Sequence, residues 1–126
     1  MTVAHNKDLV RRFVKLVFEE RRPEAVDQLV AADFVSHTWP SADGDSRAYL
    51  RQAAERMSKM PGEVSFTVED LVAERDEVAA RLHVKVSTGD KGYEIGEIHI
   101  FRVRGGLIVE HWHQYDALGM QRQLNG

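Results

Sequence analysis

Hydrophobic residues in the first quarter of the chain recur at three- and four-residue intervals, which is the spacing of the buried face of a helix. The pattern predicts a first helix over residues 3–20, with Thr2 or Asn6 as its cap, and a shorter second helix that starts at Pro23. The side chains that would form the buried face are Leu9, Val10, Phe13, Leu16, Val17, Val26, Leu29 and Val30.

A short strand and a third helix are expected next. Residues 34–38 have the composition of a strand. After a polar loop, Asp43 or Asp45 can cap a helix that runs to about Lys59. The Pro-Gly pair at residues 61–62 then ends this helix.

From residue 63 onward hydrophobic and polar residues alternate, which is the period of β-strands. The alternation shifts its phase near Glu69 and Asp70, and this shift predicts a bulge. Turns are expected at residues 75–77 and 89–92, so the segment folds into four antiparallel strands. Helices that come ahead of such a sheet pack together on one of its faces, which makes the predicted fold class α+β.

The last two strands form a hairpin, and its loop length decides which side chains share a face. If residues 104–106 form a three-residue loop, His99 lies opposite His111. One face then carries Glu97, His99, Phe101, Val103, Leu107, Val109, His111, His113 and Tyr115. A two-residue loop would instead place His99 opposite Trp112 and bring Asp116 to its side. We favour the three-residue loop and keep Asp116 as a catalytic candidate.

Composition narrows the class of protein. Residues 1–126 are expected to form one domain, since the chain is too short for two cores. The absence of cysteine excludes disulfides, a thiolate nucleophile and cysteine-bound zinc. A net charge of −3 offers nothing to attract nucleic acid, and no apolar run is long enough to span a membrane. The first residues lack the layout of a signal peptide, so we expect a cytoplasmic protein.

The order of elements resembles that of a known family. With residues 33–37 (DFVSH) after the second helix, and residues 100–103 (IFRV) and 106–112 (GLIVEHW) near the end, the chain resembles the SnoaL-like polyketide cyclases. These belong to the nuclear transport factor 2-like superfamily, together with ketosteroid isomerase and limonene epoxide hydrolase. The resemblance implies a cone-shaped, curved antiparallel sheet wrapped on its concave face by three helices from the N-terminal half. It also implies an apolar cavity, a homodimer and no cofactor.

The resemblance also implies roles for single residues. His99 matches the strand position at which ketosteroid isomerase has an oxyanion-stabilising aspartic acid, and His113 matches that of an acid/base aspartate in the cyclases and the epoxide hydrolase. Phe13 falls near the essential tyrosine of the isomerase, and His37 or Thr38 falls where its general base would be. Because neither that phenol nor that carboxylate is present, we do not expect ketosteroid isomerase chemistry.

Imidazole groups could replace those aspartates. Imidazole has an ordinary pKa of about 6.5, and burial favours its neutral form, which accepts protons. We expect acid/base chemistry on a small apolar carbonyl compound, which is an aldol cyclisation, an isomerisation or a related lyase step. In an aldol cyclisation, His113 would remove the carbon-bound proton and His99 would stabilise the enolate oxygen, with Tyr115 as an extra donor. The predicted substrate contacts are Phe13, Val35, His37, Trp39, Phe66, Phe101, His111 and Tyr115.

Other functions stay open. The same cavity could bind a hydrophobic ligand without chemistry, or the chain could be a dimerisation domain that uses the outer sheet face around Ile100, Arg102 and Trp112. His111 and His113, facing His99, supply enough imidazoles for zinc or copper. A two-apart histidine pair is a loose pattern, however, and we expect no metal.

Overall fold

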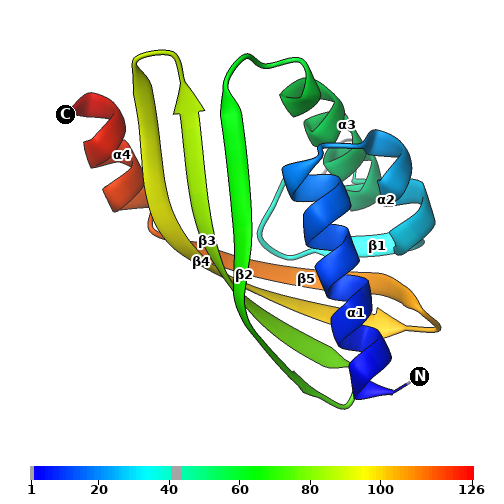
Figure 1. Cartoon of the computed structure of the whole chain (residues 1–126). Helices are drawn as coiled ribbons and strands as arrows, with labels where there is room; N and C mark the ends of the chain where they lie inside the picture. The colour runs from blue at the N-terminus through cyan, green and yellow to red at the C-terminus, as the bar shows by residue number, and fades with distance from the viewer. Residues whose placement is uncertain (1, 41–43) are drawn as a thin grey trace.

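The computed structural model describes residues 2–40 and 44–126 and has the predicted α+β class. Helices from the N-terminal part lie against a strongly curved five-stranded sheet (Figure 1). The elements in chain order are α1 (Val3–Phe13), η1 (Val14–Glu19), α2 (Pro23–Leu29), β1 (Val30–Ser36), α3 (Ser46–Ser58), β2 (Glu63–Glu74), β3 (Glu77–Thr88), β4 (Lys91–Arg104), β5 (Leu107–Tyr115) and α4 (Ala117–Asn125).

The sheet is mixed, which corrects the prediction of an antiparallel sheet. Its order is β1-β5-β4-β3-β2, and β2 to β5 form the expected antiparallel meander. β1 pairs in parallel with β5, because α3 carries the chain from β1 to the opposite edge before the meander begins. The bulge predicted near Glu69 is confirmed by the register shift between Val68 and Asp70.

Local sequence signals explain the helix ends. The Thr2 side chain accepts a hydrogen bond from the backbone N–H of His5 and caps α1, as predicted. The first helix reaches Glu19, close to the predicted end, but its last six residues form the wider π-helical turn η1. Asp45 caps α3 through the N–H of Ala48, whereas the alternative cap Asp43 lies outside the described residues.

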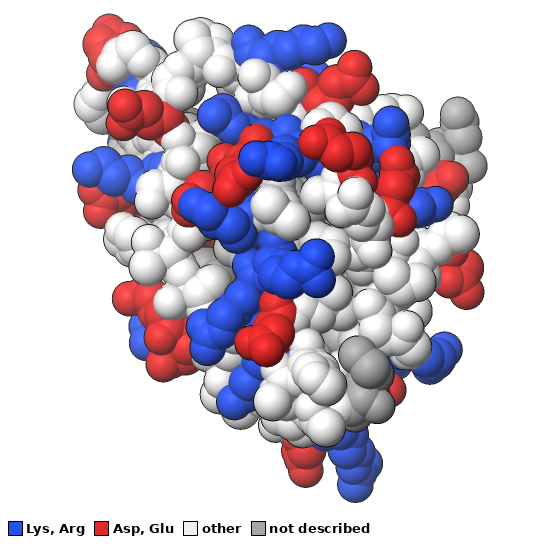
Figure 2. Space-filling model, turned by 45° about the vertical axis from the view of Figure 1, so that its right-hand side comes forward, with Lys and Arg blue, Asp and Glu red and all other residues white. Residues whose placement is uncertain are grey.

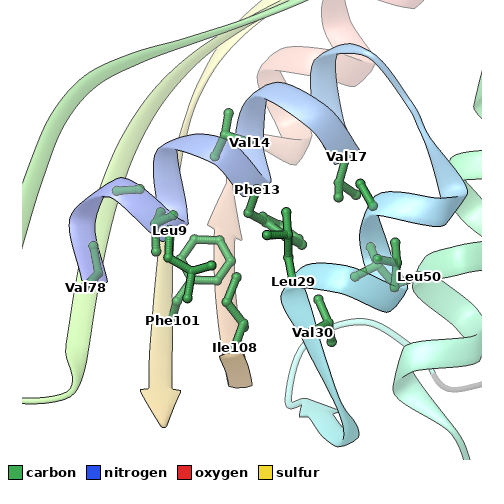
Figure 3. Packing of buried hydrophobic residues seen from close by; sticks show 14 of the residues in the cluster. Leu9, Phe13, Val14, Val17, Leu29, Val30, Leu50, Val78, Phe101 and Ile108 are labelled. Carbon is green, nitrogen blue, oxygen red and sulfur yellow. The ribbon is translucent and has the colours of Figure 1, made fainter. Parts of the chain in front are cut away.

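The hydrophobic core holds the helices on the concave face of the sheet (Figure 3). Phe13 is 1% exposed and meets Phe101, which is fully buried, with their ring centroids 5.3 Å apart in an edge contact. Other members of the core are Leu9, Val10, Val14, Val17, Leu29, Val30, Leu50, Val78 and Ile108. The predicted apolar helix stripe therefore packs against strand residues, and Phe13 and Phe101 are core residues.

The terminal hairpin has a two-residue loop, so the predicted three-residue loop is wrong. Gly105 and Gly106 have φ of 60° and 80°, as a type I′ turn requires, and Arg104 pairs with Leu107. A bulge at Val109 adds one residue to β5, because Val103 pairs with Ile108 but Arg102 pairs with Glu110.

The loop and the bulge together set the faces of this hairpin. The two-residue loop places Ile108 opposite Val103, so that Ile108, in place of Leu107, is buried in the core. The bulge then restores the predicted face of the later residues, but His99 lies opposite His113 and not opposite His111 as predicted.

α4 was not predicted, and it gives Asp116 a structural role. The Asp116 side chain accepts a hydrogen bond from the N–H of Gly119 and caps this helix. α4 lies along β4 beyond the end of β5 (Figure 1), where the Gln123 side chain bonds both backbone groups of Glu94. The helix thereby covers a strand edge that β5 leaves open.

Charged groups of both signs are interspersed over the face shown in Figure 2. Asp27, for example, forms ion pairs with both Arg47 and Arg51. In the described part of the chain, no helix has the length and apolar character needed to cross a membrane.

Candidate active site

A cavity of about 210 Å³ lies between the end of the first helix, α3 and the sheet. Most of its wall is apolar or aromatic, and three ionisable side chains stand on one side of it. The lining residues are Val17, Phe18, Trp39, Tyr49, Leu50, Ala53, Ala54, Met57, Phe66, Glu97, His99 and His113. A few polar groups in a mostly apolar cavity are typical of a small-molecule site.

Strand geometry brings the three ionisable groups together. Glu97 and His99 are two apart on β4 and share a face, and His113 lies directly opposite His99 on β5. The Oε1 atom of Glu97 lies 2.8 Å from Nε2 of His99, with which it forms a hydrogen bond. It lies 3.2 Å from Nε2 of His113. The two imidazole rings stack with their centroids 4.0 Å apart.

Each cavity imidazole has a second partner at its other ring nitrogen, Nδ1. Nδ1 of His99 lies 2.8 Å from Nε2 of His111, and Nδ1 of His111 lies 3.0 Å from the hydroxyl of Ser36. On the other side, the indole N–H of Trp39 donates to Nδ1 of His113 over 3.2 Å. His99 and His111 are 1% and 0% exposed, so these contacts replace the water that both rings lose.

The charges of the site follow from burial and these contacts. Burial alone would raise the pKa of the Glu97 carboxyl, but the interactions with His113 and His99 outweigh burial and lower that pKa to about 2. Burial lowers the pKa of His99, and it is also the main reason that the pKa of His111 falls to about 2. At neutral pH Glu97 is ionised, while His99 and His111 are neutral.

Four predicted residues line the cavity: Trp39, Phe66, His99 and His113. His111 stands one layer behind them and contacts His99. Phe13 and Phe101 lie in the core beneath the cavity, although the Phe101 ring stacks on His99 at 5.8 Å.

Four other predicted residues lie away from the cavity. Val35 is 45% exposed. His37 stacks on Trp112 on the outer face of the sheet and bonds Glu110. Tyr115 stacks on His113 at 5.1 Å but is 45% exposed and does not line the cavity, and Asp116 is the cap of α4.

Sequence reasoning placed Glu97 on the histidine face but gave it no role. Its position two residues before His99 was the available signal, because a strand directs both side chains to one side. For the lining residues of η1 and α3, such as Phe18 and Tyr49, no sequence pattern indicates a position in the cavity wall. Their positions depend on how the helices cross the sheet.

The ligand atoms of Glu97, His99 and His113 lie within 4.8 Å of one another, as a metal site would need. The donor chemistry at His113 opposes this use. A metal on Nε2 of His113 would leave the ring proton on Nδ1, where it would face the indole N–H of Trp39, which can only donate. The residues present therefore suit proton transfer better than metal binding.

Comparison with known proteins places this geometry in a family. The model of the SnoaL-like polyketide cyclase family matches residues 8–124. Among solved structures, a candidate polyketide cyclase from Bacillus cereus is similar, with 29% identity, a TM-score of 0.84 and coverage of 96% of this chain and 80% of that one.

Two further structures show the same fold. TsrD from Streptomyces laurentii has 24% identity and a TM-score of 0.86, and the match covers 98% of this chain and 97% of that one. An LEH-like epoxide hydrolase from Mycobacterium tuberculosis has 14% identity and a TM-score of 0.79, with 98% and 91% covered. No curated protein shows significant sequence similarity to the chain.

Proposed function

Because the chain belongs to the SnoaL-like polyketide cyclase family, we propose that it is an enzyme that carries out cofactor-independent acid/base chemistry on a small apolar carbonyl compound. The observation that supports this proposal is the Glu97, His99 and His113 cluster in the wall of an apolar cavity. Such a cavity strengthens electrostatic interactions with charge that develops during a reaction. The reaction type that we propose is an aldol cyclisation.

His113 is the better proton acceptor of the two cavity groups that could serve. A carboxylate with a pKa of about 2 is a weak base. Imidazole is intrinsically a stronger base than such a carboxylate. Glu97 therefore acts as the ionised partner that stabilises the imidazolium formed on His113, with Oε1 and Nε2 3.2 Å apart.

The proton arrives at Nδ1 of His113, which accepts a hydrogen bond from the indole N–H of Trp39. A hydrogen bond between neutral groups contributes only about 1 kcal/mol, so a bound substrate can take its place. The carbon-bound proton moves to Nδ1, and its electron pair forms the enolate. The enolate carbon then bonds a second carbonyl carbon, and the resulting alkoxide takes the proton back from His113.

His99 serves this chemistry as a positioning residue. Both of its ring nitrogens are already bonded, to Glu97 and to His111, so no nitrogen is left for an enolate oxygen. Tyr49 lines the cavity, and its hydroxyl group can donate a hydrogen bond, so we assign the stabilisation of the enolate oxygen to it.

The first prediction tests proton abstraction without knowledge of the natural substrate. The protein should accelerate hydrogen–deuterium exchange at the central carbon of an apolar 1,3-diketone such as benzoylacetone, followed by NMR. His113→Asn and Glu97→Gln should lower the protein-dependent exchange rate by about a hundredfold or more, the usual contribution of a general base. His83→Asn is the matched control, since His83 is an exposed strand histidine that pairs with Glu94, and should leave the rate unchanged.

The alternative function is binding without chemistry. It would be favoured if benzoylacetone bound in the cavity and its exchange rate equalled that in buffer. Full exchange activity in His113→Asn would also overturn the assignment of the base. The homodimer implied by the family resemblance stays a prediction.

A further inference from the structure

Two chains of side-chain contacts lead from residues 36–39, which comprise the last residue of β1 and the start of the loop after it, to the same carboxylate oxygen. One chain runs from the hydroxyl of Ser36 through His111 and His99 to Oε1 of Glu97. The other runs from the indole of Trp39 to His113, whose Nε2 lies 3.2 Å from the same atom without forming a hydrogen bond to it. The two starting residues are hydrogen-bonded to each other, because the Ser36 hydroxyl oxygen accepts a hydrogen bond from the backbone N–H of Trp39 over 3.1 Å.

In the shorter chain, from Trp39 to His113, the indole group determines which atom donates the hydrogen bond. The indole N–H of Trp39 can only donate, so Nδ1 of His113 must accept. A neutral imidazole carries one ring proton, and that of His113 is therefore on Nε2, which faces Glu97.

The longer chain has the same direction. The Ser36 oxygen already accepts the backbone N–H groups of Thr38 and Trp39, which leaves its own proton to be donated to Nδ1 of His111. His111 then carries its proton on Nε2 and donates it to Nδ1 of His99. The proton of His99 is therefore also on Nε2 and points at Glu97.

We infer that segment 36–39 holds both cavity imidazoles in one tautomer, with the ring proton on Nε2, the nitrogen nearer to Glu97, and that Ser36, Trp39 and His111 are positioning residues of the site. One consequence rests on the proposed function: a bound substrate replaces the Trp39 indole as the partner of Nδ1 of His113, the proposed base. The tautomers themselves require no substrate.

The burial of His111 supports a role beyond packing. The ring is 0% exposed, does not line the cavity, stacks on the Trp39 ring at 3.9 Å and meets the Phe101 ring at 5.1 Å in a tilted contact. An apolar side chain could fill this place with no polar atoms to satisfy. What the imidazole adds is a fixed acceptor on one side and a fixed donor on the other.

The test must separate segment 36–39 from Glu97, since the carboxylate also favours an Nε2–H on both rings. In Glu97→Gln the charge is removed and only the segment holds the tautomers. Nitrogen-15 NMR of histidine-labelled protein should show protonated Nε2 and unprotonated Nδ1 for His99 and His113, both in the unmodified protein and in this variant. One neutral hydrogen bond gives a tautomer ratio of about 5:1.

Two double variants then remove the first hydrogen bond of one chain each, so that the histidines of that chain are no longer held in one tautomer. Adding Ser36→Ala to Glu97→Gln should leave His99 and His111 as mixtures of both tautomers, whereas adding Ser36→Thr, which keeps the hydroxyl, should not. Adding Trp39→Phe should release His113 alone and leave His99 unchanged. A merely structural role would not produce this separation, and thermal unfolding verifies that each variant is folded.

The inference is overturned if the unmodified protein carries the proton of His99 or His113 on Nδ1, or if Glu97→Gln alone releases both rings. Either result could occur while diketone exchange persists, which would leave the proposed function standing. Confirmed tautomers without any exchange would overturn the proposed function alone.

Discussion

At the scale of single residues, the site depends on polar side chains that have exchanged water for specific partners. His111 is 0% exposed and keeps both nitrogens bonded, to Ser36 and to His99. Its burial lowers its pKa to about 2, so the ring stays neutral in the folded protein over the physiological range. A buried neutral imidazole is suited to fix the direction of a hydrogen bond, whereas it is a poor proton acceptor.

The same burial makes stability depend on pH. The pKa values of His99 and His111 are lowered in the folded state, so below about pH 6.5 the unfolded chain binds protons that the folded chain does not. We expect the free energy of unfolding to fall as pH decreases from 6.5, by up to about 1.4 kcal/mol per pH unit for each of these groups. Urea unfolding at pH 7, 6 and 5 measures this slope.

Glu97 extends the loss of stability to lower pH. Its pKa is lowered to about 2, so its stabilising contribution is present above the ordinary glutamate pKa and is lost as pH falls from about 4.5 toward 2. The window between pH 6.5 and 5 therefore isolates the histidines. His83→Asn, which leaves both buried histidines in place, should keep the wild-type slope there, and a flat profile in the unmodified protein would contradict the assignment.

At the scale of elements, the β4–β5 hairpin determines which groups reach the cavity. Gly105 has φ of 60°, and no neighbouring atom lies within 4 Å of an added Cβ, so conformation alone limits substitution there. We expect Gly105→Val to lower the free energy of unfolding by about 1–2 kcal/mol.

Asparagine provides the matched comparison. Gly105→Asn should be nearly neutral, because asparagine tolerates positive φ in this turn type. Urea denaturation of both variants measures the difference. Equal stability of the valine and asparagine variants would indicate that the loop does not have the two-residue form.

At the scale of the whole molecule, the cavity lies where residues of η1 and α3 face the curved sheet. Ala53 lines the cavity from α3, while its neighbour Gln52 is exposed on the same helix. Ala53→Phe should occupy part of the roughly 210 Å³ and raise the dissociation constant of benzoylacetone at least about tenfold, which corresponds to about 1.4 kcal/mol.

Gln52→Phe adds the same ring outside the cavity and should leave the affinity unchanged. Isothermal titration calorimetry measures both constants, and thermal unfolding verifies that both variants fold. Unchanged affinity in Ala53→Phe would show that the ligand binds elsewhere on the molecule.

The sequence by itself determined the α+β class, the buried stripe of the first helix, the bulge near Glu69 and the shared face of His99, His111 and His113. These features follow from local periodicity, which depends only on the geometry of helices and strands. The predicted histidine face is correct although the predicted loop length is wrong. The loop is one residue shorter than predicted, and the bulge at Val109 adds one residue to β5, so the two differences cancel.

Only the tertiary structure decided the rest. The role of Glu97, the contact between Trp39 and His113, and the parallel position of β1 all join segments that are distant in the chain. Tyr115 and Asp116 were placed by the end of β5 and the start of α4, which periodicity did not reveal. Hydrogen bonds between distant side chains depend on how elements are stacked and staggered, and alternation along one strand carries no information about that arrangement.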